Sequence, residues 1–191
     1  AFTTCTHCGP RYSIMTTLPY DRPNTTMSPF VMCADCEQEY HDPINRRHYS
    51  QTNSCPTCGI TLSAYNNQSE LLATASGDIG PLVTEALTQG KIIAVKGIGG
   101  YLLVCDATSE EAVQALRKRK HRPTKPFALL YSSMEEIRKD ALVSTAEESA
   151  LRSIEGSIVL VRKIKGKTKL AESIAPGLER LGVMLPYAPL L

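Results

Sequence analysis

Residues 92–120 read IIAVKGIGGYLLVCDATSEEAVQALRKRK, and this stretch decides the class of the fold. It opens with two short apolar runs, residues 92–95 and 101–105, separated by a glycine-rich segment. Short apolar runs bounded by glycine and charged residues are typical of buried strands. We therefore expect two strands joined by a short connection.

The second half of this stretch predicts an amphipathic helix. Thr108 and Glu111 have the spacing of a capping box at a helix start. Apolar residues then recur on one helical face, which we expect to point inward: Ala112, Val113 and Leu116.

The flanking sequence continues the alternation of helix and strand. Pro81 and Gly90 mark the start and end of a helix upstream. Downstream, residues 127–131 and 157–161 predict strands, and Ser133 with Glu136 predicts the cap of the helix between them. Short connections of this kind indicate an α/β (α+β) domain over residues 79–191.

The composition excludes several classes of protein. The chain has 191 residues, with 21 Lys and Arg against 19 Asp and Glu, so its net charge of +2 argues against a nucleic-acid-coating or membrane-surface role. No apolar run approaches the roughly 20 residues of a membrane span. No signal peptide precedes the first cysteine, so we expect a cytoplasmic protein. The chain lacks an initiator Met and ends on an apolar run, which predicts an internal fragment.

Residues 1–60 differ from the rest of the chain. They are rich in Pro, Asn, Thr and Asp and hold three CxxC pairs. Such a turn-rich segment buries too little side chain to fold alone, so its order must come from a metal or a neighbour. We interpret residues 61–78 as a polar linker to the α/β domain.

Two of the three CxxC pairs have the spacing of a structural zinc site. Eighteen residues separate the pair Cys33/Cys36 from the pair Cys55/Cys58. Two such turns can direct four thiolates at one ion, which is a closed and therefore structural site. A redox pair is the alternative, and we disfavour it because neither pair is expected at a helix start after an apolar strand.

The remaining cysteines predict less. Cys5 and Cys8 form half of a second zinc site, and nothing upstream in this chain supplies the other half. Cys105 lies in an apolar run, so we expect a small buried side chain rather than a reactive thiol.

The run RKRKHRPTK, residues 117–125, is the strongest candidate for anion binding. Residues 117–119 are explained as the solvated end of the preceding helix. Lys120, Arg122 and Lys125 lie among prolines at the entrance of a strand, where fixed cations suit a polyphosphate. RNA and plain solvent exposure remain alternatives.

Taken together, these motifs resemble a known family. The segment CTHCGPRYSIMTTLPYDRPNTTMSPFVMCADCEQEYHDPINRRHYSQTNSCPTCG is similar to the zinc-finger region of the hydrogenase-maturation carbamoyltransferases, the HypF family. The later segments IIAVKGIGGYLLVCDAT, KRKHRPTKPFALL and IAPGLERLGVMLPYAPLL resemble the YrdC-like domain of that family, which has a twisted mixed sheet. The family carries a further CxxC upstream, the implied partner of Cys5 and Cys8.

The resemblance implies a function. In that family the YrdC-like domain condenses ATP, with Mg²⁺, and carbamate derived from carbamoyl phosphate into carbamoyl-adenylate. The carbamoyl group then passes to the C-terminal cysteine of HypE, for the cyanide ligands of nickel–iron hydrogenase. The family's K-x-R motif matches Lys120 and Arg122, which are the implied catalytic residues. The implied nucleotide-binding residues also include Lys96, Gly99, Gly100 and Lys125.

The resemblance also implies missing parts. A Ser-x-Asn motif on a later strand has no counterpart here, so we expect a C-terminally incomplete YrdC-like domain. Two alternatives stay open: a zinc-stabilised module that binds double-stranded RNA, and a threonylcarbamoyl-adenylate synthase. The second is disfavoured because Val95-Lys96-Gly97 stands where those enzymes read Pro-Thr-Glu.

Overall fold

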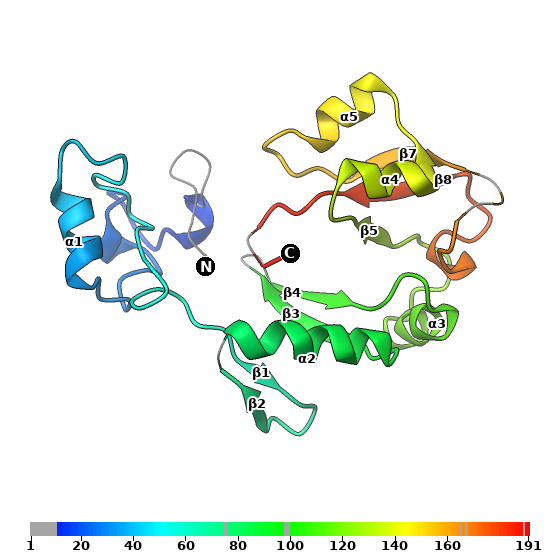
Figure 1. Cartoon of the computed structure of the whole chain (residues 1–191), viewed down its shortest axis with the longest axis horizontal. Coiled ribbons are helices and arrows are strands. Elements are labelled where there is room, and N and C mark those ends of the chain that lie inside the picture. Colours follow the sequence, from blue (N-terminus) through cyan, green and yellow to red (C-terminus); the bar gives the residue numbers. More distant parts are fainter. Residues whose placement is uncertain (1–10, 75, 98–99, 165, 167, 189) are drawn as a thin grey trace. The chain divides into compact units, whose positions relative to one another are not determined.

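The computed structural model describes residues 11–74, 76–97, 100–164, 166, 168–188 and 190–191. The chain divides into two compact units, one over Ala1–Gly80 with Leu190 and one over Pro81–Pro189 with Leu191 (Figure 1). Within the described residues, no helix is long and apolar enough to cross a membrane.

The first unit is small and has little regular structure. Its elements are the 3-10 turns η1 (Tyr12–Ile14) and η2 (Arg22–Asn24), the helix α1 (Ala34–His41) and the antiparallel strands β1 (Ala64–Tyr65) and β2 (Leu71–Ala73). The hairpin β1–β2 lies in the segment 61–78 that we interpreted as a linker. The unit boundary falls inside α2 (Ser76–Thr88).

The interior of the first unit is largely polar. Arg22 is only 8% exposed, and its guanidinium donates hydrogen bonds to the carbonyl oxygens of Gln51 (2.9 Å), Asn53 (2.8 Å) and Phe30 (2.7 Å). Gln51 in turn accepts a 2.9 Å bond from the Tyr40 hydroxyl of α1. Turns far apart in sequence are thus tied together by hydrogen bonds, because a segment poor in apolar residues offers few hydrophobic contacts.

The second unit has the expected mixed α/β architecture. Its strands are β3 (Ile93–Gly97), β4 (Gly100–Val104), β5 (Ala128–Leu130), β6 (Ala141–Leu142), β7 (Val159–Lys163) and β8 (Arg180–Met184). Its remaining elements are α3 (Glu110–Arg119), α4 (Met134–Asp140), α5 (Thr145–Leu151) and η3 (Glu172–Ile174). Strands β3 and β4 form an antiparallel hairpin, and the other four form a sheet in the order β5-β8-β7-β6. That sheet is mixed, because β5 and β8 are parallel while the other neighbours are antiparallel.

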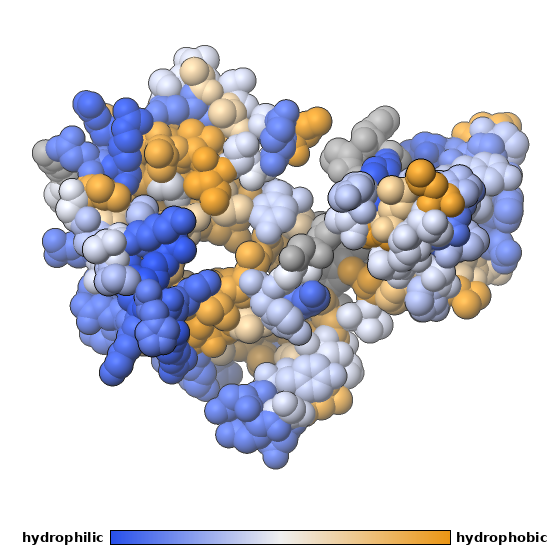
Figure 2. Space-filling model, turned by 180° about the vertical axis from the view of Figure 1, so that it is seen from behind, coloured by the Kyte–Doolittle hydropathy of each residue, from blue (hydrophilic) through white to orange (hydrophobic). Residues whose placement is uncertain are grey.

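The core of this unit lies on one face of the four-stranded sheet. In β7 and β8, Val161 pairs with Leu181, and both are buried with their neighbour Val183. The core cluster adds residues of α3, α4, α5 and η3: Val113, Met134, Ile137, Leu151 and Ile174. Leu130 and Leu160 alternate with the buried positions and are exposed, so apolar side chains also reach the surface (Figure 2).

Two helix starts differ from the sequence prediction. The cap of α3 is Ser109, whose hydroxyl accepts a 3.2 Å bond from the amide of Ala112, while Thr108 instead bonds to Asp106. Helix α2 begins at Ser76, so Pro81 lies inside it rather than at its start. Proline cannot donate the hydrogen bond to the preceding turn, yet the helix continues through Pro81 to Thr88. The inward face of α3 and the Ser133 cap of α4 are confirmed.

Ile137 in α4 tests the core, because its side chain is fully buried in the central cluster. We expect Ile137→Ala to lower the free energy of unfolding of the second unit by about 2–5 kcal/mol through lost burial and a residual cavity. Urea denaturation followed by circular dichroism measures this change. The matched control is Ile154→Ala, since Ile154 is 87% exposed; equal losses in both variants would contradict the described core.

Candidate metal centre and basic loop

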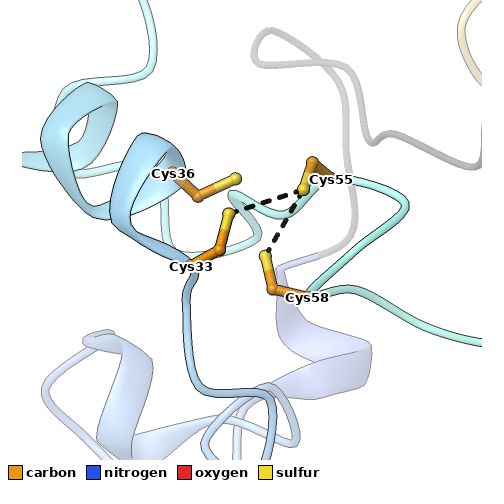
Figure 3. Close-up of side chains that lie close together, drawn as sticks. All are labelled: Cys33, Cys36, Cys55 and Cys58. Atoms are coloured by element: carbon orange, nitrogen blue, oxygen red, sulfur yellow. Dashed lines mark hydrogen bonds between the residues drawn. The ribbon is translucent and has the colours of Figure 1, made fainter.

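Four cysteines of the first unit converge on one point. The side chains of Cys33, Cys36, Cys55 and Cys58 place all four sulfur atoms within 4.8 Å of one another (Figure 3). The Sγ atoms of Cys33 and Cys55 are 3.6 Å apart, and those of Cys55 and Cys58 are 3.8 Å apart. Sulfur–sulfur separations of this size match the edges of a tetrahedron of thiolates around zinc. The predicted cluster is thus assembled.

The first pair of sulfurs is placed by a helix start. Cys33 is the N-cap of α1 and has extended backbone, whereas Cys36 lies in the first turn of α1 and is buried. This pair therefore lies at a helix start, but the element before α1 in the described residues is the 3-10 turn η2 and not an apolar strand. Asp35 and Glu37 in the first turn complement the helix dipole and favour the helix here. The redox interpretation is still disfavoured, because the sulfur atoms of the second pair lie beside those of the first and complete a four-sulfur cluster.

The second pair is placed by a tight turn. The amide of Thr57 donates to the Cys55 sulfur at 3.4 Å, and the amide of Gly59 donates to the Cys55 carbonyl at 2.8 Å. Backbone amides of Cys58 and Thr57 directed at this sulfur lower the pKa of Cys55 to about 6. Its thiolate, which is the form that binds metal, is therefore favoured near neutral pH.

The donor set fits zinc. Burial raises the pKa of Cys36, and hydrogen bonds between its thiol and the neighbouring cysteine side chains raise it further, because both favour the protonated form. A divalent ion removes that penalty, and four sulfur ligands leave no open position for a substrate. The Asn53 side chain also donates a 2.8 Å bond to the Cys36 carbonyl, which ties the cluster to the polar interior. The geometry is that of a structural metal centre.

Among the described residues, Cys105 is the one cysteine outside this cluster. Cys5 and Cys8 lie outside the described residues. Cys105 follows β4 and packs against the core of the second unit. Its burial and the adjacent Asp106 raise the pKa of its thiol, which therefore stays protonated near neutral pH. Cys105 is half-buried, so it is less buried than the sequence predicts.

The basic run folds into a loop between α3 and β5. Lys120 caps the C-terminus of α3 and is exposed, as is Lys125. The half-buried Arg122 donates to the carbonyl oxygens of Lys125 (3.1 Å) and Pro126 (2.6 Å), and its guanidinium packs over the ring of Phe127. We name residues 120–126 the basic loop. It brings the predicted cations Lys120, Arg122 and Lys125 into one short segment at the entrance of β5.

One residue of the run contradicts the sequence prediction. Arg117 was expected at the solvated end of α3, but it is only 8% exposed. Its guanidinium donates to carbonyl oxygens of the basic loop and of η3. The repeated Arg and Lys residues of the run do not distinguish Arg117 from its neighbours. Its spacing of four residues from Val113, which puts both on one face of the helix, is the one sequence feature that could have predicted its burial.

Strands β3 and β4 pair antiparallel up to Gly97 and Gly100, which are cross-strand partners. Lys96 is exposed in β3, and its Nζ lies 5.1 Å from the ring centroid of its cross-strand partner Tyr101. Gly100 has a φ of 145°, which side chains rarely adopt, so glycine is required there. Gly99 lies outside the described residues. The roles of Lys96, Gly99 and Gly100 as nucleotide-binding residues stay predictions.

The fold and the two candidate sites are those of a class of protein in which a four-cysteine finger is joined to an α/β domain. In that domain the basic loop leads into β5, the first strand of the four-stranded sheet. The chain belongs to the Sua5/YciO/YrdC family, whose family model, described as "Telomere recombination", matches residues 85–191. A second family model, described as "HypF finger", matches residues 32–65, which include the four cysteines.

The chain is similar to carbamoyltransferases over its whole length. It is 49% identical to the carbamoyltransferase HypF of Rhodobacter capsulatus over 100% of this chain and 25% of the relative. It is 48% identical to HypF of Synechocystis over 99% of this chain and 24% of that protein. The chain thus spans about a quarter of the length of these relatives.

Two solved structures agree with this relationship. A full-length HypF in a phosphate- and nucleotide-bound form matches 99% of this chain and 24% of its own, at 45% identity and a TM-score of 0.88. HypF of T. kodakarensis matches 98% of this chain and 24% of its own, at 45% identity and a TM-score of 0.91. The predicted resemblance to the HypF family and the predicted α/β fold class are therefore confirmed.

Cys55 tests the metal centre. Cys55→Ser removes one of the four sulfur ligands, so we expect zinc binding at the cluster to be lost and residues 30–60 to become sensitive to protease. Native mass spectrometry counts the bound zinc, and limited proteolysis measures the order. Cys105→Ser is the matched control, because Cys105 lies in the second unit. Native zinc content and native protease resistance in Cys55→Ser would show that the site is misassigned.

Gly59 tests the turn that places the second pair. A Cβ atom built on Gly59 would lie 2.8 Å from the Cys55 carbonyl oxygen and 2.9 Å from Ser54 Oγ. We expect Gly59→Ala to weaken zinc binding by about 10- to 100-fold, the range seen when the surroundings of metal ligands are disturbed. Competition with a chromogenic chelator measures the affinity. Gly80→Ala, where the added methyl meets nothing, should bind zinc as the unchanged chain does.

Proposed function

We propose that this chain supplies the zinc-finger and adenylate-forming parts of a cytoplasmic carbamoyltransferase of the HypF type. The observation that carries the proposal is identity of nearly half the residues to HypF relatives, which extends without interruption through both finger and α/β domain. A stand-alone threonylcarbamoyl-adenylate synthase is less well supported, because the finger model also matches this chain.

The proposed reaction joins two substrates. Water first hydrolyses carbamoyl phosphate to carbamate and inorganic phosphate. A carboxylate oxygen of the carbamate then attacks the α-phosphorus of Mg·ATP, and the bond from the α-phosphorus to the α–β bridging oxygen breaks. The products are carbamoyl-adenylate and pyrophosphate. The terminal thiolate of HypE then attacks the carbamoyl carbon, forms the thiocarbamate and expels AMP.

The basic loop suits the first step. Negative charge grows on the bridging oxygen as pyrophosphate leaves, and cations fixed in advance stabilise it without reorganising. Arg122 is held by two backbone carbonyls and by Phe127, so its guanidinium is preorganised. Lys120 and Lys125 are exposed on the same loop and add mobile charges for the β- and γ-phosphates.

The finger has a different part in this proposal. Closed coordination by four thiolates provides no site for a reacting group, so the metal stabilises the fold and takes no part in the reaction. We assign it the role of holding the first unit in shape. The residues that handle ATP then lie in the second unit alone.

Arg122 tests nucleotide binding directly. We expect Arg122→Ala to weaken Mg·ATP binding by this chain about tenfold or more, because a charge-assisted contact to phosphate contributes on the order of 1.5–3 kcal/mol. Isothermal titration calorimetry measures the affinity. Arg119→Ala removes an equal charge from the exposed end of α3 and should change the affinity less than threefold. Equal affinities in the two variants would remove Arg122 from the site.

Catalysis is best tested in the context of a whole relative. The matching quarter of Rhodobacter capsulatus HypF is replaced by this chain, and ATP–pyrophosphate exchange is measured with and without carbamoyl phosphate. Exchange that requires carbamoyl phosphate, and that falls when Arg122→Ala is added, supports the proposal. A folded chimera that binds ATP but shows no such exchange contradicts it.

A further inference from the structure

Arg117 uses its charged group for backbone contacts. Its Nη1 donates to three carbonyl oxygens of the basic loop, its Nε to one of η3 and its Nη2 to another. The acceptors are Arg122 (2.8 Å), Pro123 (3.3 Å), Lys125 (3.2 Å), Ser173 (2.5 Å) and Ile174 (3.1 Å). The basic loop is therefore folded around a buried cation.

This contact determines which way the loop faces. A backbone whose carbonyl oxygens turn inward to one guanidinium must present its other groups outward. Lys120 and Lys125 are accordingly exposed, and Arg122 is half-exposed. His121 has a positive φ of 49°, which marks the bend where the chain leaves α3 and wraps around Arg117.

The charge of Arg117 is not neutralised by a carboxylate in the described part of the chain. No ion pair there involves Arg117, and all its hydrogen-bond acceptors are neutral carbonyls. Arg117 and Arg122 also pack on the same ring, at 4.7 and 5.2 Å from the centroid of Phe127. Two guanidinium groups on one aromatic ring, without a facing carboxylate, leave a local positive charge that favours binding of an anion at the exposed side of the basic loop.

Fastening η3 to α3 does not by itself require Arg117. The Glu110 carboxylate, at the start of α3, accepts a hydrogen bond from the Ser173 hydroxyl and a second from the Ser173 amide at 3.2 Å. That contact ties the two elements together without a buried cation. In the described residues, the side-chain contacts to the Arg122 and Pro123 carbonyls of the basic loop come from Arg117, while the Lys125 carbonyl also accepts from Arg122.

We propose that Arg117 is a positioning residue of the nucleotide site: it shapes the basic loop so that Lys120, Arg122 and Lys125 are presented together to the phosphates. This inference rests on the proposed function. Arg117 acts through the loop and through its fixed buried charge, and it does not itself contact the nucleotide.

The test uses three variants of the full chain. Arg117→Met removes the charge and the forked donors, while Arg119→Met removes an equal charge from the exposed side of α3. Ile137→Ala destabilises the same unit without touching the loop. Affinities for Mg·ATP and for inorganic tripolyphosphate are measured well below each unfolding midpoint. Hydrogen exchange of the loop amides is followed without ligand.

We expect Arg117→Met to bind both ligands at least tenfold more weakly and to exchange the amides of residues 121–127 faster. Arg119→Met and Ile137→Ala should bind within threefold of the unchanged chain, which separates positioning from general destabilisation. If Arg117→Met does not fold, Arg117→Lys decides the question, because it keeps the charge but cannot reach acceptors on several sides; it should show the same weakening.

The two proposals fail in different ways. If the unchanged chain binds neither ligand, the proposed function fails, and the role of Arg117 in binding fails with it. If the unchanged chain binds both and Arg117→Met binds as tightly as Arg119→Met, only the positioning role is overturned. A loss in Ile137→Ala as large as in Arg117→Met would also overturn it, since stability alone would then explain the effect.

Discussion

Hydrogen bonding of buried guanidinium groups to backbone carbonyls is the interaction on which the irregular parts of both units depend. Arg22 binds three carbonyls in the finger unit, and Arg117 binds five in the α/β unit. Loops without regular structure have carbonyl groups with no partner in a helix or sheet, and each costs free energy if buried unpaired. Arginine can satisfy several at once, because its planar fork holds five N–H donors. Each loop thus has one defined shape.

The metal centre applies a second constraint, which is electrostatic. The four thiols do not all ionise readily, because the pKa of Cys36 is raised while that of Cys55 is lowered. A divalent cation favours the thiolate form of all four, so metal binding and folding of the finger are coupled. Its polar interior, linked to Cys36 through Asn53, is consistent with that coupling. A finger whose ligands are all protein sulfurs is a scaffold, and this assigns the proposed chemistry to the other unit.

In the α/β unit, the basic loop owes its place to the sheet. It leads directly into β5, whose neighbour β8 is the strand furthest along the chain. Because β5 and β8 are parallel, the start of β5 lies at the same sheet edge as the start of β8, after η3. Arg117 can therefore reach both the basic loop and η3.

Features that depend on local pattern could be predicted from the amino-acid sequence. The four-cysteine cluster followed from the spacing of two CxxC pairs, and β3, β4, β5 and β7 followed from short apolar runs. The buried face of α3 followed from its period. Tertiary structure decided what depends on partners far along the chain. The sequence predicts Arg117 to be one more exposed cation. In the structure its hydrogen-bond acceptors include the carbonyl oxygen of Ser173, which is 56 residues further along the chain. The central place of β8 likewise depends on β5 and β7. Only folding brings such acceptors and strands together. A local sequence pattern does not indicate which distant backbone groups will form hydrogen bonds with one another.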